Sequence, residues 1–207
     1  MTQKQKEQLE KFKKFTSWMC GDISRTMFCA KANFLVAQGL VNYTETLGSF
    51  LRPYKTSKKG KIVRTTTGER FLAFFVRLGA EYQKLLRKYW GKNSKKVYDD
   101  LRNGLTHEYL IKRKYFTVYG VDKFMSDGDL DHLTIKIDGR PTHCPCGIIH
   151  QRTKNRKGYW HFVNGKYFVD FKRAVENYIK EIESEKFPNL NRHFLIRANE
   201  VNLKHFN

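Results

Sequence analysis

The chain has 207 residues, 40% of them hydrophobic, with 16 Phe, 11 Tyr and 3 Trp, which is enough for a folded core and excludes general disorder. Its 40 Lys and Arg residues against 20 Asp and Glu residues give a net charge of +20, which favours a polyanionic partner, most simply nucleic acid. Because four cysteines make a poor disulfide framework, and we find neither an apolar leader nor an apolar run of about 18 residues, we expect a cytoplasmic protein without a membrane partner.

Residues 3–19 carry apolar side chains at helical spacing, which predicts a first helix with one apolar stripe: Leu9, Phe12, Phe15, Trp18 and Met19. Gly21 and Asp22 indicate a break, with Asp22 as the N-cap of a second, long helix that ends near residue 51. Gly39 and Gly48 in this helix either let a neighbouring helix approach closely or only lower its stability.

Residues 54–64 are polar and lack periodicity, so we expect a loop. Its cations either contact RNA phosphates or belong to a solvated connector, and the candidates for RNA binding are Lys58, Lys59, Lys61 and Arg64. Thr66 and Glu69 fit a capping box that opens the next helix, whose apolar stripe ends at Gly91.

Ser94 is the expected N-cap of a further helix that runs to about Lys112. At about 100° per residue, its apolar side chains fall on one arc: Val97, Tyr98, Leu101, Leu105 and Tyr109. Asn103 and His107 stack on the opposite, polar face. Arg102 lies at the rim of the apolar arc, and its side chain is long enough to reach the same groove.

Arg102, Asn103 and His107 together suit RNA cleavage. An imidazole with an ordinary pKa of about 6.5 takes and returns protons at neutral pH, and a guanidinium binds phosphate oxygens in pairs. A base, a phosphate clamp and the 2′-hydroxyl of the substrate suffice for transesterification without a metal. The alternative is that these side chains are only the solvated face of an amphipathic helix.

The motif Arg102-Asn103-x-x-x-His107-x-Tyr109 resembles the Arg-x4-His-x-Tyr signature of the HEPN superfamily, α-helical domains of many prokaryotic defence and toxin–antitoxin systems. The resemblance covers roughly residues 1–115 and part of 166–186. It implies a helical bundle, ribonuclease roles for Arg102, Asn103 and His107, and a homodimer in which two motif helices form one composite cleft. It also implies that Tyr109 is the residue that antitoxins of this kind modify with AMP.

After Lys112 the pattern changes to β. Strands are expected near residues 115–119, 133–137, 148–150 and 159–163, in a small antiparallel sheet of about three to five strands. Asn164 and Gly165 indicate a further turn, with residues 166–168 returning as a strand. The hairpin around residue 155 is basic and aromatic, so it either contacts RNA or has one face in the core; its candidate RNA-binding cations are Arg152, Lys154, Arg156 and Lys157.

His143, Cys144, Cys146 and His150 are candidate zinc ligands. The Cys-x-Cys spacing is tighter than the usual two-residue gap, and no second cysteine pair follows it. We therefore favour a reduced thiol turn and expect no metal and no cofactor. A zinc-binding adaptor is the alternative.

Residues 171–182 form a final amphipathic helix, capped by Asp170, that packs back on the bundle as its fourth member. Residues 194–196 either dock on the bundle or add a strand. We therefore predict a mainly α, HEPN-like antiparallel helical bundle with a small antiparallel β-sheet insert, α+β overall. Its parts are a bundle with the motif (1–112), a β-rich insert (113–165) and a C-terminal helix with a tail (166–207).

The predicted function is a metal-independent endoribonuclease of a toxin–antitoxin or antiviral system, which cleaves RNA as a homodimer and has an antitoxin or another defence protein as a further partner. The alternative is a non-catalytic HEPN-like module that binds RNA or a protein partner.

Overall fold

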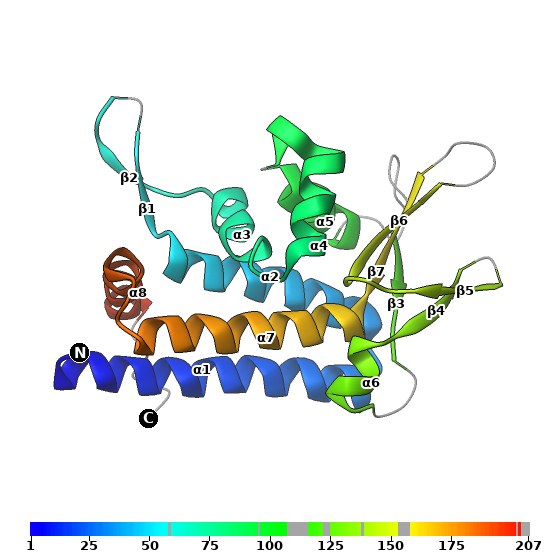
Figure 1. The fold of residues 1–207 in the computed structure, drawn as a ribbon, viewed down its shortest axis with the longest axis horizontal. Helices are drawn as coiled ribbons and strands as arrows, with labels where there is room; N and C mark the ends of the chain where they lie inside the picture. The colour runs from blue at the N-terminus through cyan, green and yellow to red at the C-terminus, as the bar shows by residue number, and fades with distance from the viewer. Residues whose placement is uncertain are drawn as a thin grey trace.

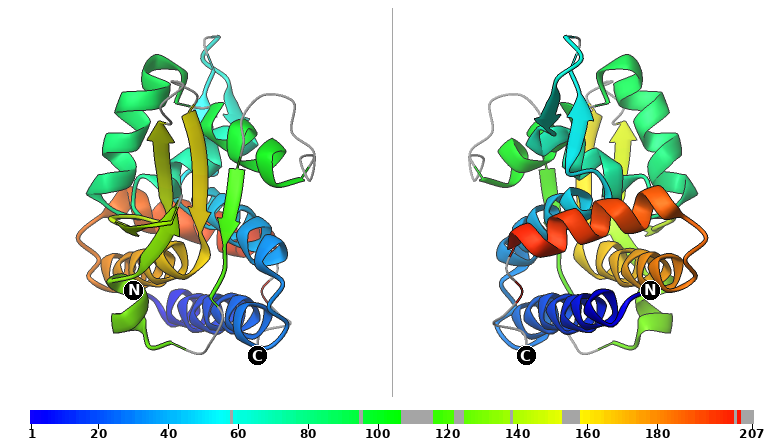
Figure 2. Two further views of the ribbon diagram at one scale, coloured as in Figure 1. Left: turned by 90° about the vertical axis from the view of Figure 1, so that its right-hand side faces the viewer. Right: turned by 90° about the vertical axis from the view of Figure 1, so that its left-hand side faces the viewer.

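The computed structural model describes residues 1–57, 59–94, 96–106, 116–121, 125–137, 139–152, 158–201 and 203. The fold is mainly helical with a few small sheets, as the sequence predicts (Figure 1). The long helices α1 (Gln3–Phe28), α2 (Asn33–Leu51) and α7 (Asn164–Glu183) pack together, and α8 (Pro188–Val201) crosses one end of this layer (Figure 2).

The first helix is longer than predicted, because α1 continues through Gly21 and Asp22 without a break. Met19, Ile23 and Met27 are all buried, so the apolar stripe continues across the glycine, and this packing outweighs the low helix propensity of Gly21. Asp22 is therefore not an N-cap; its carboxylate accepts a hydrogen bond of 2.8 Å from a tyrosine hydroxyl of α2.

Residues 54–64 form a hairpin instead of a loop. β1 (Tyr54–Thr56) pairs in antiparallel register with β2 (Ile62–Arg64), and Gly60 makes the turn with a φ of 74°. The sequence signal is weak because both strands lack a buried face, so no apolar alternation marks them. The predicted capping box is confirmed: Thr66 Oγ1 accepts from the Glu69 amide at 3.3 Å, and a Glu69 carboxylate oxygen accepts from the Thr66 amide at 3.0 Å.

The helix predicted after Thr66 is divided into short pieces. α3 (Thr67–Phe75) and α4 (Ala80–Leu85) are separated at Gly79, whose φ of 145° no other residue adopts readily. A π-helical turn, η1 (Leu86–Trp90), and a 3-10 turn, η2 (Gly91–Asn93), follow. The motif helix α5 (Lys96–Thr106) comes next, and the rest of its predicted length lies outside the described residues.

The predicted strands are present, but they do not form one antiparallel sheet. β3 (Phe116–Tyr119), β7 (Gly158–Val163) and β6 (Ile148–Arg152) form a three-stranded sheet in the order β3-β7-β6. β3 runs parallel to β7, and β6 runs antiparallel to it. β4 (Thr134–Ile137) and β5 (Arg140–His143) form a separate hairpin that follows the short helix α6 (Asp127–Asp131).

The turn and returning strand predicted at residues 164–168 are wrong, because α7 begins at Asn164, directly after β7. Asn164 donates a 2.8 Å hydrogen bond to the carbonyl of Asn33, which holds the helix start against α2. Gly165 lies so close to α6 that an added Cβ would be 2.6 Å from Leu130 Cδ2. Asp170 is consequently a buried residue within the helix and not its cap.

A single large hydrophobic core joins the helices to the three-stranded sheet, with fully buried side chains contributed by both: Phe12, Leu40, Phe74, Phe162 and Tyr178. A smaller cluster of Ile135, Ile137, Cys144 and Val163 lies under the β4–β5 hairpin.

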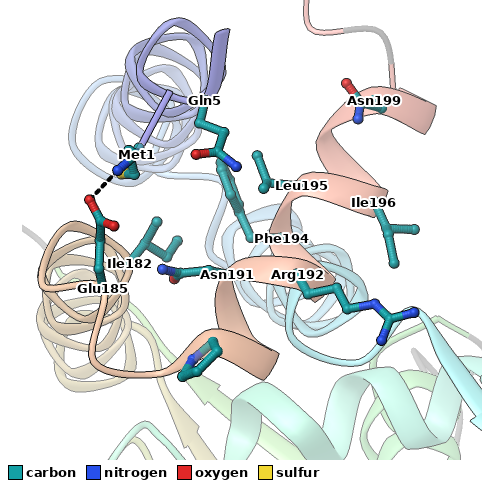
Figure 3. A pocket seen from close by; sticks show the side chains of 11 residues that line it. Met1, Gln5, Ile182, Glu185, Asn191, Arg192, Phe194, Leu195, Ile196 and Asn199 are labelled. Atoms are coloured by element: carbon teal, nitrogen blue, oxygen red, sulfur yellow. Dashed lines mark hydrogen bonds and ion pairs between the residues drawn. The ribbon is translucent and has the colours of Figure 1, made fainter. Parts of the chain in front are cut away.

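The segment 194–196 is helical and docks on the bundle. Phe194 of α8 is buried and packs edge-on against Phe12, with 5.2 Å between ring centroids. An open hollow of about 610 Å³ remains between the first turn of α1, the end of α7 and α8 (Figure 3). Its rim includes an ion pair between the amino group of Met1 and Glu185. Within the described part of the chain, the predicted site residues do not line it.

Candidate nucleic-acid interface

Helix α5 buries the apolar arc from Val97 to Leu105 in the core, as predicted. Val97, Tyr98, Leu101 and Leu105 are at most 4% exposed, whereas Arg102 is exposed. The Arg102 guanidinium carbon lies 5.9 Å from the centre of the Tyr98 ring, so the side chain rests at the border of the apolar arc. Burial raises the pKa of the Tyr98 phenol, while the positive charge of Arg102 acts in the opposite direction.

The other motif residues are described only in part. Asn103 belongs to α5, but its side chain is not described, and His107 and Tyr109 lie outside the described residues. Of the predicted trio, the structure therefore places only the Arg102 side chain, and the distances among the three side chains stay outside the described residues.

Two aromatic contacts fix α5 in place. Phe71 of α3 packs against Tyr98, with 5.3 Å between ring centroids. Trp90 of η1 donates a 2.8 Å hydrogen bond from its indole nitrogen to the Asp100 carboxylate, and its ring packs 4.8 Å from Trp160 of β7. The contact between Trp90 and Asp100 was not predicted, because a spacing of ten residues corresponds to no recognised sequence motif.

A second group of polar and aromatic side chains lies next to Trp90, which packs 6.3 Å from Tyr89 between ring centroids. Tyr89 and His150 are joined by a 3.1 Å contact between the phenol oxygen and Nδ1, and Lys88 Nζ lies 5.1 Å from the centre of the Tyr89 ring. They border a hollow of about 350 Å³ between η1 and β6, which Lys84 also lines. A phenol, an imidazole and the Lys88 ammonium group are suited to hold an anion beside an aromatic surface, whereas Lys84 is paired at 2.6 Å with Glu81, which also lines the hollow.

The β1–β2 hairpin exposes cations on the same side of α2 as helices α3 to α5 (Figure 1). Lys59, Lys61 and Arg64 are exposed, as a phosphate contact requires. Arg64 also lies 3.8 Å from the Glu200 carboxylate, and Lys58 lies outside the described residues.

The aromatic hairpin between β6 and β7 is less available than predicted. Trp160 and His161 are each 5% exposed, because the sheet is covered on both faces at these positions, so neither can stack on an RNA base. Arg152 belongs to β6, but its side chain is not described, and Lys154, Arg156 and Lys157 lie outside the described residues.

The cysteines of the candidate zinc group are buried, and each thiol faces a backbone carbonyl. Cys146 Sγ lies 3.0 Å from the carbonyl oxygen of Ile148, and Cys144 Sγ lies 3.7 Å from that of Thr142. Burial raises the pKa of Cys146 to about 12, which disfavours the thiolate that a metal needs. Among the described residues, no group of three or more His, Cys, Asp or Glu side chains is arranged to hold a metal ion.

Of the helices in the described part of the chain, none is long and apolar enough to cross a membrane. No protein-family model, curated protein or solved structure matches this chain.

Proposed function

We propose that this chain is a HEPN-like, metal-independent endoribonuclease of a toxin–antitoxin or antiviral system. The observation that carries the proposal is the division of α5 into two faces. Its apolar residues are buried, whereas Arg102, the first residue of the motif, is exposed on the surface, where a guanidinium can meet a phosphate. The net charge of +20 and the exposed cations of the β1–β2 hairpin support RNA as the substrate.

In the proposed reaction the 2′-oxygen attacks the adjacent phosphorus, and the bond from phosphorus to the 5′-oxygen breaks. His107 takes the 2′-hydroxyl proton or protonates the leaving 5′-oxygen. Arg102 stabilises the charge that develops on the phosphate oxygens, and Asn103 orients one of these two groups. The products carry a 2′,3′-cyclic phosphate and a 5′-hydroxyl.

The proposal includes a homodimer in which two α5 helices face each other. This arrangement would bring His107 of each protomer near Arg102 of the other, although the two residues point in directions about 140° apart on a single helix. Tyr109 would lie beside the cleft, so that an antitoxin that transfers AMP to Tyr109 could block the cleft.

Arg102→Ala and Lys96→Ala form a matched pair for testing the proposal, because both remove an exposed cation from α5. Loss of transition-state stabilisation should lower the cleavage rate of Arg102→Ala by about a hundredfold or more, whereas RNA binding should change far less. Lys96→Ala should cleave like the parent. Equal rates for all three proteins, or RNA binding without cleavage by the parent, would favour the non-catalytic RNA-binding module.

A further inference from the structure

One face of α1 combines an exposed tryptophan with cations. Lys14, Trp18, Gly21 and Arg25 fall within an arc of about 60° on the helix. The buried residues of α1 lie on the opposite side, so this face points directly away from the core. Trp18 is 47% exposed, which corrects its assignment to the apolar stripe.

The exposure of Trp18 is exceptional among the tryptophans of the chain. Trp90 and Trp160 are 7% and 5% exposed, respectively. Trp18 lies 6.3 Å from Tyr43 of α2 between ring centroids, and this contact supports the indole while about half of the residue stays exposed. The exposed indole offers a flat aromatic surface on which a nucleic-acid base can stack.

The surface beside Trp18 is hollowed and positively charged. Gly21 has no side chain, and a Cβ added there would lie 3.5 Å from an Arg25 guanidinium nitrogen, so Arg25 folds back over the glycine towards Trp18. An open hollow of about 640 Å³ lies along this face, lined by Lys13, Lys14, Ser17, Trp18, Gly21 and Arg25.

Of the acidic groups near this face, Glu10 and Glu183 are paired with a cation, whereas Asp22 accepts only from a neutral phenol and keeps its charge. Lys13 Nζ lies 2.7 Å from Glu10 and 2.8 Å from Glu183, and the Asp22 carboxylate accepts from Tyr43. Within the described residues, Lys14 and Arg25 form no such pair. The face therefore offers two cations without an ion-pair partner on either side of an aromatic ring, with the Asp22 carboxylate at its edge. Cations that flank an aromatic ring are the arrangement that binds single-stranded nucleic acid.

We propose that this face of α1 is a second RNA site, which holds a single-stranded segment by stacking a base on Trp18 and placing its phosphates on Lys14 and Arg25. The inference rests on the proposed function only in taking RNA as the substrate. Helices α2 and α7 separate α1 from α4 and α5 (Figures 1 and 2), so the site holds a part of the strand remote from the cleavage point. Long single strands should therefore bind more tightly than short ones.

Tryptophan fluorescence reads this site directly, because Trp90 and Trp160 are buried. The probe is a 2′-O-methylated single strand of about 16 nucleotides, which the proposed reaction cannot cleave. Adding it should quench the emission of the parent protein, and Trp18→Phe should lose the quenchable signal. Trp18→Ala should bind the strand about tenfold more weakly, because base stacking on an aromatic ring is lost. Leu35→Ala, which removes an apolar side chain that is 59% exposed on α2, should bind like the parent.

Charge reversal tests the cations separately. The double variant Lys14→Glu/Arg25→Glu should bind the labelled strand more weakly and with a shallower dependence on salt. The double variant Lys4→Glu/Lys6→Glu changes the net charge equally and also lies on the exposed surface of α1, so it is the control.

The outcomes separate this inference from the proposed function. If the parent binds and cleaves RNA while Trp18 is not quenched and the two charge reversals act equally, the α1 site is wrong and the ribonuclease stands. If Trp18 is quenched but the parent never cleaves, the site stands and the ribonuclease is wrong. If the parent does not bind RNA, both are wrong. Emission that changes with protein concentration alone would instead identify a contact between two copies of the chain and overturn the RNA site.

Discussion

Lys166 is a buried cation that pairs with two carboxylates. Its ammonium group lies 2.6 Å from the Asp131 carboxylate and 2.8 Å from that of Asp170, while Lys166 and Asp170 are 5% and 4% exposed. Asp170 also accepts a 2.9 Å hydrogen bond from Tyr82, whose oxygen in turn accepts one of 2.8 Å from the Gly147 amide. This network links α6, α7 and α4 to the chain just before β6.

The charges in this network depend on one another. The hydrogen bond from Lys166 lowers the pKa of Asp131. Burial by itself would lower the pKa of Lys166, but its hydrogen bonds with the two carboxylates outweigh burial and raise it. Lys166 is therefore charged at neutral pH and compensates the buried Asp170.

Lys166→Met should destabilise the protein by about 3 kcal/mol, because the buried Asp170 carboxylate loses its nearest cation and keeps only the Arg173 guanidinium, at 3.6 Å. Lys172→Met is the control, since its ion pair with the exposed Asp127 contributes at most about 1 kcal/mol. Urea unfolding monitored by circular dichroism measures both. Equal stabilities of the two variants would show that the network does not stabilise the fold.

The exposure of a side chain could be predicted from the sequence where the periodicity of a single helix determines it. The buried arc of α5 and the exposed Arg102 follow from the helical period. Trp18 does not, because an apolar residue at the edge of a stripe can lie on either side of the boundary. The pairing of Tyr89 with His150 depends on a contact between residues that are distant in sequence, which no local pattern encodes.

The packing of α2 on α3 depends on Gly48. A Cβ at this position would lie 1.7 Å from the carbonyl oxygen of Arg70, and that atom belongs to the backbone and cannot move aside. At Gly39 the nearest atom is Ile23 Cδ1 at 2.8 Å, the end of a flexible side chain. Gly48 therefore lets a neighbouring helix approach closely, which is one of the two roles that the sequence left open for it, the other being only a loss of helix stability.

Gly48→Ala should destabilise the protein by about 3 kcal/mol because α2 and α3 must separate, whereas Gly39→Ala should cost less than about 1 kcal/mol. Both introduce the same methyl group into α2, so helix propensity affects them equally. Denaturant midpoints of the two variants provide the measurement. A Gly48→Ala protein as stable as Gly39→Ala would contradict the close packing.

Element types were predicted better than element boundaries. The Thr66 capping box and the strands β4, β6 and β7 are where the local signals indicate. Gly21 and the pair Asn164-Gly165 are strong breaking signals that the fold overrides, because the flanking residues are buried against neighbouring helices. The β1–β2 hairpin was missed because neither strand has a buried face.

The way strands combine into sheets could not be derived from the chain order of the segments. An antiparallel sheet is the simplest arrangement for successive strands, yet β3 joins β7 in parallel and the β4–β5 hairpin stays separate. This arrangement depends on the core that helices and sheet share, and hydrophobic periodicity does not specify which elements meet in it.

Alkaline pH should weaken the whole molecule. Burial raises the pKa of Cys146 from its ordinary value of 9.0 to about 12, and it raises the pKa values of Tyr82, Tyr167 and Tyr178 above their ordinary value of 10.0. The folded protein therefore keeps protons that the unfolded chain releases. The contribution of these groups to the free energy of unfolding should be constant below their ordinary pKa values and fall above pH 9.0, by about 1.4 kcal/mol per pH unit for each group that has ionised only in the unfolded chain.

Urea unfolding at a series of pH values measures this dependence. Cys146→Ala should make the decline shallower between pH 9.0 and 10.0, because it removes one of the earliest groups to titrate. A free energy of unfolding that stays constant well above pH 10.0 would mean that these side chains are accessible to water.

The ribonuclease proposal is tested most directly by incubating the parent protein and His107→Ala with RNA in excess EDTA and identifying the ends of the fragments. We predict that the parent produces 2′,3′-cyclic phosphate ends, while His107→Ala still binds RNA and produces none. Cleavage by both proteins at the same rate would exclude His107 from the reaction. Absence of cleavage by either, with salt-sensitive RNA binding by both, would contradict the proposal and identify the chain as a binding module.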